Sequence, residues 1–213
     1  MKIVSVNVGL PRPVEWRGRR IMTGIFKEPV TGRIAVRKLN LAGDRQADLS
    51  VHGGVYKAVY AYPSEHYPFW RQELDLSNLA WGAFGENLTT EGWWEDEVHI
   101  GDRFRAGTAE FIVTQPRTPC FKLALKFDRD DVVDEFLQSA RPGFYLAVAK
   151  EGELGVDDAF ERIHEDEHHV SVVDIVNLYL HRQARPDPDL LLRATEVEAL
   201  PEAWRQHFRR RLG

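Results

Sequence analysis

The chain has 213 residues, of which 43% are hydrophobic and 29% are charged, as is ordinary for a globular protein. The formal net charge of −5 argues against a broad nucleic-acid-binding surface, since phosphate backbones are bound by a surplus of Lys and Arg. The single cysteine excludes an intramolecular disulfide, which fits a reducing compartment.

Met1–Val8 alternates polar and apolar residues, unlike the continuous apolar stretch of a signal peptide. The sequence also has no uncharged apolar run of the ~18 residues that a membrane helix needs. We therefore expect a cytoplasmic protein with neither nucleic-acid nor membrane partners.

Residues 1–163 carry short apolar runs broken by turn residues, a pattern typical of β-strands. A tight hairpin is indicated where Gly18 separates two such runs, and helical spacing is found at 64–74 and 130–138. The other strands are expected at 3–8, 34–39, 55–60, 98–100, 103–106, 109–114 and 144–149. Strands at this spacing predict a barrel-like β domain over residues 1–163 with a few peripheral helices.

Residues 168–213 show helical periodicity and are predicted to form a second domain, a small three-helix bundle. Ser171 and Asp174 form a capping-box pattern at the first helix, and Pro201 marks the start of the last. Three such helices bury little surface alone, so we expect them to dock on the barrel or on a partner. The fold class is thus α+β, mainly β.

The stretch His164–His169 between these parts is interpreted as a solvated linker. Its histidines lack the cysteines or the regular spacing of a zinc site. His99 alternates with Val98 and Ile100 and is interpreted as an outward-facing strand residue. Both are weaker candidates for chemistry than the three segments that follow.

Cys120 is the first candidate for a reactive or metal-binding group. Pro116 and Pro119 fix the backbone and lack N–H donors, so the preceding strand must give way to a stiff loop that holds the thiol. Arg117 and Lys122 flank the thiol and favour the thiolate, which is the form that binds metals. A buried structural cysteine is the alternative, although a stiff basic loop is an unusual place for one.

The segment Gly43–Ala58 combines glycines with basic side chains. Its glycine pair permits close approach of the backbone to a ligand, and Arg45, His52 and Lys57 can converge on an anionic group. The alternative is a polar turn before a strand, with solvated charges.

The segment Gly82–Gly92 crowds glycines around Glu86 and Asn87. The amide of Asn87 can both donate and accept hydrogen bonds, which suits the edge of a heterocycle. The alternative is a glycine-rich turn capped by Asn87.

Taken together, these segments resemble the MOSC family, the domain named for the C-terminus of molybdenum cofactor sulfurases. The matching motifs occur in the family's order at Gly43–Gln46, His52–Gly54, Gly85–Leu88, Gly101–Asp102 and Gln115–Cys120. The helical tail from His168 to Leu212 is similar to the three-helix extension of YiiM-like members. The resemblance therefore covers nearly the whole chain.

This resemblance implies a β-barrel that binds the molybdenum cofactor, Mo-molybdopterin, with Cys120 as a thiolate ligand of the metal. The chemistry of the other matched residues suggests that they line the cofactor pocket, Glu86 less strongly than the rest: Arg45, His52, Lys57, Glu86, Asn87 and Arg117. His52 is the expected catalytic proton donor, because the pKa of histidine lies near neutrality.

YiiM-like members are associated with reduction of N-hydroxylated compounds such as 6-hydroxylaminopurine, a detoxification of base analogues. Because one cysteine cannot hold an iron–sulfur cluster and no dinucleotide fingerprint is present, electrons are expected from a separate flavoprotein reductase. One alternative is a carrier that uses Cys120 to bind the cofactor or sulfur. Another is a thiol enzyme that uses Cys120 with His52.

Overall fold

The computed structural model describes residues 1–48, 53–180 and 187–212. Within them the chain forms strands and α-helices with short 3-10 turns between. The strands are β1 (Lys2–Val8), β2 (Arg12–Trp16), β3 (Arg19–Thr23), β4 (Glu28–Val30), β5 (Ile34–Arg37), β6 (Asn40–Leu41), β7 (Val59–Pro63), β8 (Leu88–Glu91), β9 (Arg103–Ala106), β10 (Ala109–Pro116), β11 (Phe144–Lys150), β12 (Gly152–Leu154) and β13 (Glu161–His164). The helices are α1 (Tyr67–Glu73), α2 (Phe121–Phe127), α3 (Val132–Ser139), α4 (Val172–Tyr179), α5 (Pro188–Glu196) and α6 (Glu202–Leu212).

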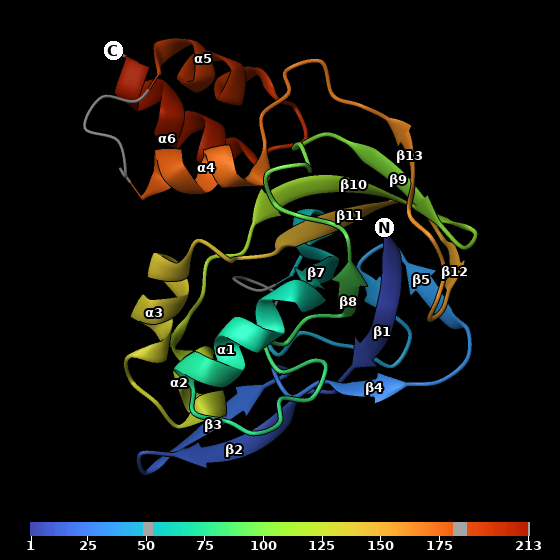
Figure 1. The fold of residues 1–213 in the computed structure, drawn as a ribbon, viewed down its shortest axis with the longest axis vertical. Helices are drawn as coiled ribbons and strands as arrows, with labels where there is room; N and C mark the ends of the chain where they lie inside the picture. The colour runs from blue at the N-terminus through green and yellow to red at the C-terminus, as the bar shows by residue number, and fades with distance from the viewer. Residues whose placement is uncertain (49–52, 181–186, 213) are drawn as a thin grey trace.

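An eight-stranded sheet in the order β13-β9-β10-β11-β7-β8-β1-β4 curls into a half-barrel (Figure 1). Its neighbouring strands pair antiparallel except β7 and β8, which run parallel. A three-stranded sheet β12-β5-β6 and the hairpin β2-β3 complete the strands of the described residues. The mainly β fold with added helices is thereby confirmed.

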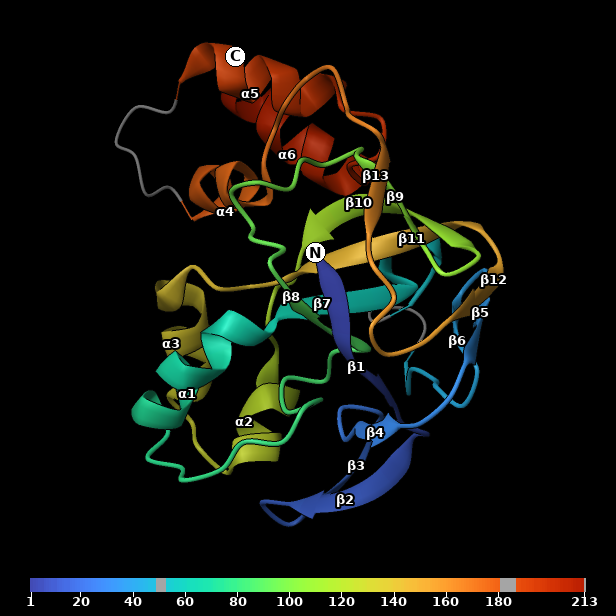
Figure 2. The same ribbon diagram turned by 45° about the vertical axis from the view of Figure 1, so that its right-hand side comes forward.

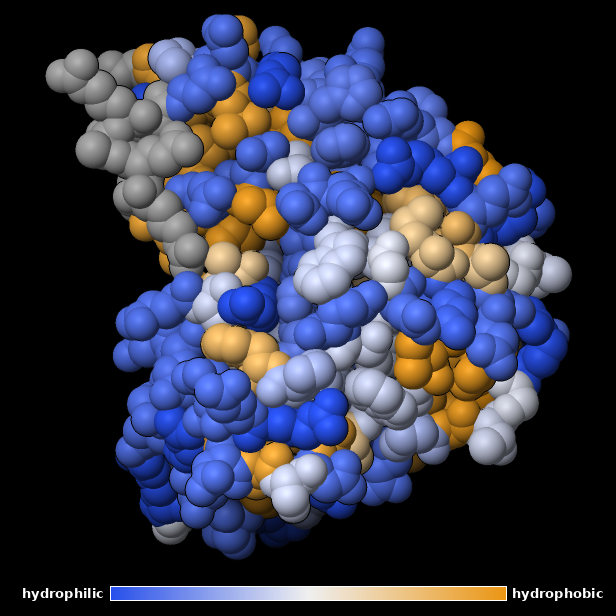
Figure 3. Space-filling model, viewed as in Figure 1, coloured by the Kyte–Doolittle hydropathy of each residue, from blue (hydrophilic) through white to orange (hydrophobic). Residues whose placement is uncertain are grey.

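The helices lie in two groups on different sides of the sheet. Figures 1 and 2 show α1, α2 and α3 together near the hairpin β2-β3, and α4, α5 and α6 together at the opposite end of the molecule. Figure 3 shows one face of the molecule as mostly hydrophilic, with separate apolar areas. Each of the C-terminal helices packs apolar residues into the main core, namely Ile175 of α4, Leu191 of α5 and Phe208 of α6.

The main hydrophobic core runs from the half-barrel into the C-terminal helices without a break. Trp93, in the loop after β8, packs edge-on against Phe104 of β9 and Phe144 of β11, and all three side chains are fully buried. The same cluster includes Ile175 of α4 and Phe208 of α6, which are also fully buried. Burial of large side chains at about 25 cal/mol per Å² makes this shared core a main source of stability.

A second, aromatic core lies under α1, α2 and α3. Tyr62 of β7, Trp70 of α1 and Phe136 of α3 stack on one another around Phe84. The hydroxyl of Tyr62 accepts a hydrogen bond of 2.6 Å from the indole N–H of Trp70, which satisfies both buried polar groups. This cluster supports the loops that form the candidate site.

Most of the predicted elements are confirmed. The hairpin turns at Arg17 and Gly18 with φ of 52° and 70°, the positive values that a two-residue type I′ turn requires. The capping box of Ser171 and Asp174 is present, with both reciprocal hydrogen bonds at 3.0 Å.

Two predicted strands are wrong. Val55–Lys57 forms a 3-10 turn, and β7 begins only at Val59, because Gly54 has a φ of 91° and turns the chain just before. Val98–Ile100 contributes a single β-bridge, between His99 and Ser171, rather than a strand. The pattern also does not predict β8 or α2, because the glycines and prolines around them indicate turns.

The change from strands to helices falls between the end of β13 at His164 and the start of α4 at Val172. A division into domains at 1–163 and 168–213 stays a prediction, since the core described above crosses it. None of the described helices has the length and apolar character needed to cross a membrane.

Removal of the Ser171 cap should destabilise the protein measurably. In Ser171→Ala the backbone N–H of Asp174 loses its acceptor, so the free energy of unfolding should fall by about 1 kcal/mol. Ser171→Gly should lower the free energy of unfolding by only a few tenths of a kcal/mol, because glycine exposes the helix end to water. Urea unfolding checks both variants, and an alanine variant as stable as the wild type would contradict the role of the cap.

Candidate functional site

A pocket of about 660 Å³ brings together segments that are far apart in the sequence. Five of the predicted site residues line it, namely Arg45, Lys57, Asn87, Arg117 and Cys120. The other described residues of its lining are Thr23, Gly24, Ile25, Lys27, Gln46, Ala47, Tyr60, Phe84, Gly85, Thr118, Lys122 and Tyr145. The predicted His52 lies outside the described residues, and Glu86 does not line the pocket.

The described lining of the pocket is strongly cationic. It includes the lysine and arginine side chains of Lys27, Arg45, Lys57, Arg117 and Lys122, and no aspartate or glutamate. A concave surface of one charge concentrates ions of the opposite charge. The pocket therefore suits an anionic ligand, although the protein as a whole has a net negative charge.

Cys120 lies where the loop after β10 enters α2. β10 ends at Pro116, and Cys120 has extended backbone (φ −136°, ψ 172°) immediately before the first residue of α2. Its side chain is partly exposed, as a thiol that meets a ligand must be. Burial lowers the pKa of the nearby Lys57, and its attraction to Cys120 partly opposes that change.

Arg117 is held firmly by its surroundings. The residue is 8% exposed, and its guanidinium donates a hydrogen bond of 2.7 Å to the carbonyl of Phe84. The group also lies 5.0 Å from the ring centre of Tyr60 and 5.1 Å from that of Phe136, within the range of cation–π attraction. Arginine stays protonated in such a setting, so Arg117 contributes a permanent charge at a fixed position.

Asn87 positions other groups as well as lining the pocket. Its amide oxygen accepts from the backbone N–H of Tyr60 at 3.1 Å. Its amide nitrogen donates to a carboxylate oxygen of Asp44 at 2.9 Å and to the carbonyl of Asn7 at 3.3 Å. Asp44 also pairs with Lys27. Because both N–H groups are used, the amide of Asn87 has no donor left for the edge of a heterocycle.

Glu86 has a different place from the predicted one. It is fully buried, and its carboxylate accepts hydrogen bonds from the hydroxyls of Tyr67 and Thr89 and from the backbone N–H groups of Gly82 and Phe84. The assignment of Glu86 to the pocket lining is therefore wrong. Its side chain turns into the protein because four donors there replace water around the charge.

Sequence reasoning misses two tyrosines of the lining and one lysine behind it. Burial raises the pKa of Tyr60 and of Tyr145, so both hydroxyls stay protonated. Lys126 of α2 donates to the carbonyls of Ile25 and Gly82 at 3.1 and 2.6 Å. No sequence pattern identifies Lys126, because the sequence does not predict α2 and a lysine is usually exposed to solvent.

Comparisons with known proteins agree with this arrangement. The MOSC domain family matches residues 48–161, and the family described as "YiiM-like, 3-alpha helix domain" matches residues 170–212. The protein YflK of Bacillus subtilis is 41% identical over 97% of this chain and 92% of its own length. Protein YiiM of Escherichia coli is 33% identical over 89% of this chain and 84% of its own length.

A protein of Gibberella moniliformis named "Reductase" is 34% identical over 64% of this chain, which corresponds to 25% of that longer protein. Among solved structures, YiiM from Geobacillus stearothermophilus is similar with a TM-score of 0.80 and 34% identity, covering 100% of this chain and 99% of that one. YiiM from Escherichia coli gives a TM-score of 0.76 at 28% identity, covering 100% and 92%.

Loss of the Glu86 carboxylate should destabilise the fold rather than change only ligand binding. Glu86→Ala leaves four buried donors without an acceptor, so the free energy of unfolding should fall by about 3 kcal/mol or more. The exposed Glu97→Ala serves as a control and should change it by less than about 0.5 kcal/mol. Urea unfolding distinguishes them, and equal effects would rule out the structural role.

Lys126 should make stability depend on pH in the alkaline range. Burial lowers the pKa of Lys126 from 10.5 to about 8, against the opposing attraction of Glu86. Between these values the unfolded chain binds a proton that the folded chain does not. The free energy of unfolding should therefore rise with pH through this window, by about 1–3 kcal/mol.

Urea unfolding at roughly pH 7.5 and roughly pH 9.5 measures this rise. Lys126→Met should lack the contribution of Lys126, so its rise should be smaller than that of the wild type. The exposed Lys150→Met should keep the wild-type rise. A rise that is identical in all three proteins would show that Lys126 titrates normally.

Proposed function

The chain belongs to the MOSC-domain family and carries the YiiM-like three-helix domain, and on this basis we propose that it is a molybdenum-cofactor-dependent reductase of N-hydroxylated compounds. The proposal depends on one observation: a partly exposed Cys120 lines a pocket with five cationic side chains and no described acid. The resemblance to a protein named reductase supports an oxidoreductase.

The residues of the pocket fit the cofactor. A soft thiolate such as that of Cys120 suits a transition metal, and the family implies it as the molybdenum ligand. Lysine and arginine bind phosphate, which the pterin part of the cofactor carries. Arg45, Lys57 and Lys122 would hold that phosphate, while Arg117 is fixed by its carbonyl and ring contacts.

When bound, the cofactor supplies two-electron redox chemistry for the overall reaction R–NH–OH + 2e⁻ + 2H⁺ → R–NH₂ + H₂O. A separate flavoprotein reductase would supply the electrons. The substrate class we propose is N-hydroxylated purine bases such as 6-hydroxylaminopurine, and the role would be detoxification of base analogues. Phe84, Tyr60 and Tyr145 offer aromatic surface in the pocket for a flat base.

Two protons are consumed, so the chain must hold a donor close to the departing oxygen. His52 remains our proposed donor, by its place in the family motif.

The main alternative is a carrier that binds the cofactor or sulfur at Cys120 for delivery to another enzyme. Its pocket would need the same thiol and the same cations, so the two functions differ in turnover and not in binding. A loaded protein that reduces an N-hydroxylated base repeatedly would favour the enzyme. A loaded protein that only releases its cofactor would favour the carrier.

The direct experiment measures molybdenum in protein made by cofactor-competent cells, followed by reduction of 6-hydroxylaminopurine with a flavoprotein reductase. Cys120→Ser should lower bound molybdenum and the rate of reduction by at least about tenfold, because the oxygen ligand is harder and stays protonated. If the Cys120→Ser protein retains full activity, the proposal fails. If wild-type protein from such cells contains no molybdenum, a thiol enzyme becomes the better reading.

The charges of the pocket can be tested with a matched pair of lysine variants. Lys57→Met removes a pocket cation and should lower bound molybdenum about tenfold, whereas the exposed Lys150→Met should leave it unchanged. The molybdenum content of the purified variants, measured beside that of the wild type, decides between them. Equal content in all three proteins would rule out a role of Lys57 in holding the phosphate.

A further inference from the structure

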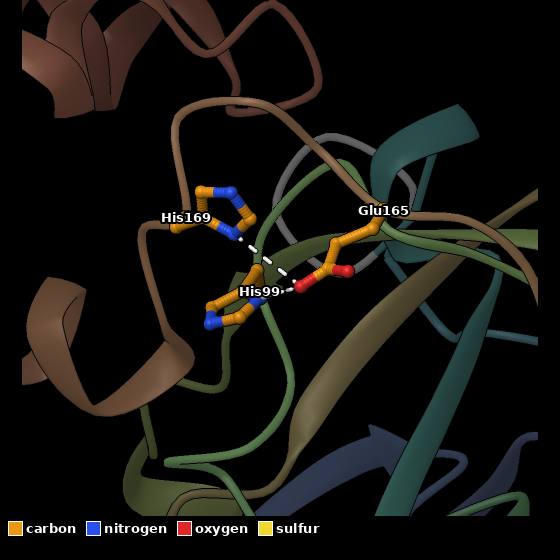
Figure 4. A group of neighbouring side chains, drawn as sticks. All are labelled: His99, Glu165 and His169. Atoms are coloured by element: carbon orange, nitrogen blue, oxygen red, sulfur yellow. Dashed lines mark ion pairs between the residues drawn. The ribbon is translucent and has the colours of Figure 1, made fainter.

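We infer a metal site formed by His99, Glu165 and His169, none of which lines the pocket. It would take a divalent transition cation such as Zn²⁺ at the joint between the sheet and the C-terminal helices. Figure 4 shows the three side chains converging on one point from two separate segments of the chain. This inference is independent of the proposed function.

The ligand atoms are nearly at metal-binding distances. Nδ1 of His169 lies 3.3 Å from Oε1 of Glu165, and Nδ1 of His99 lies 3.8 Å from the same oxygen. All three ligand atoms lie within 4.8 Å of one another. A tetrahedral zinc with bonds of about 2.0–2.1 Å holds its ligands about 3.3 Å apart, so small side-chain rotations would complete the site.

The imidazole of His99 supports a ligand in particular. Its Nδ1 is shielded from solvent and has no hydrogen-bond partner within the described part of the chain. A buried ring nitrogen without a partner is costly, and a metal ion would satisfy its lone pair. The rings of His99 and His169 meet edge to face at 5.3 Å between centres, so they share one environment.

The backbone holds the two segments together without a metal. His99 forms a β-bridge with Ser171, and Ile100 donates a hydrogen bond of 2.8 Å to the carbonyl of Val170. Val172 donates to the carbonyl of Val98 at 3.0 Å. These main-chain contacts directly follow His169 in the sequence, so they fix its position relative to His99 and preorganise the two imidazole ligands.

Arg162 would compete with the metal for the carboxylate of Glu165. Its Nη1 lies 3.5 Å from Oε1 of Glu165, and its Nε lies 3.6 Å from the buried carboxylate of Asp102. The same carboxylate of Asp102 lies 3.7 Å from Nδ1 of His99. The cation would take Glu165 from Arg162, while Asp102 stays close enough to offset part of its charge.

Three protein ligands with half-exposed Glu165 and His169 leave room for water in a fourth position. Imidazole and carboxylate ligands suit Zn²⁺ better than Mg²⁺ or Ca²⁺, which prefer oxygen alone. A cation here would link the loop of His99 to the segment that leads into α4. The site would therefore stabilise the attachment of the C-terminal helices.

The test is calorimetric titration of Zn²⁺ into the metal-free, full-length Cys120→Ser protein, which removes the thiol as a competing site. We expect one equivalent to bind, and His99→Asn and His169→Ala each to weaken the affinity at least about tenfold. His168→Ala is the matched control, because the Nδ1 of His168 already contacts Asp166 at 2.9 Å. It should bind like the parent protein.

Arg162→Gln gives the opposite expectation. Removal of the competing guanidinium should tighten Zn²⁺ binding. If the residues formed only a cluster of salt bridges, the substitution would remove an ion pair and would not increase the affinity for Zn²⁺. Excess Zn²⁺ should also raise the Tm of the parent by at least about 3 °C but not that of His99→Asn. Binding that is absent, or unchanged in both His99→Asn and His169→Ala, would overturn the site.

Discussion

One buried carboxylate, that of Glu86, fixes the wall of the pocket. Its four hydrogen bonds join α1, β8 and the loop that precedes β8 in the sequence. That loop carries Phe84. The carbonyl of Phe84 in turn receives Arg117, which settles the guanidinium between the rings of Tyr60 and Phe136. A buried carboxylate that does not line the pocket therefore determines where a pocket cation lies. Such a group persists in the interior because its donors replace water.

Other charged groups near the pocket also hold the protein together, and only some of them are left to contact a ligand. Lys27 pairs with Asp44, and Asp44 also accepts from Asn87 and from the backbone N–H of Gly9 at 3.0 Å. These groups hold three segments in register, so part of the cationic lining is used by the protein itself. Burial lowers the pKa of Lys57, and its attraction to Cys120 opposes that change, so the pocket itself sets the charge of this lysine.

The sequence predicts much of the fold and part of the site. Strands and helices with clear periodicity are found where expected, and Arg45, Lys57 and Cys120 do meet in one pocket. Glu86 and Asn87 show the limit, because neighbours in an irregular segment point in directions that only tertiary contacts decide. The approach of His99 to Glu165 and His169 has the same origin. A β-bridge between His99 and Ser171 brings the two segments together, and no local sequence pattern predicts such a long-range contact.

The shared core has a consequence for how the chain is made. Synthesis proceeds from the N-terminus, so the half-barrel leaves the ribosome before the last helices that complete its interior. Phe111 and Val113 of β10 belong to the same buried cluster as Leu191 and Phe208, so this cluster stays incomplete until the helices that carry Leu191 and Phe208 emerge. Closure of this core must therefore wait until α5 and α6 have left the ribosome, and in the meantime the nascent chain presents an apolar surface of the kind that chaperones bind.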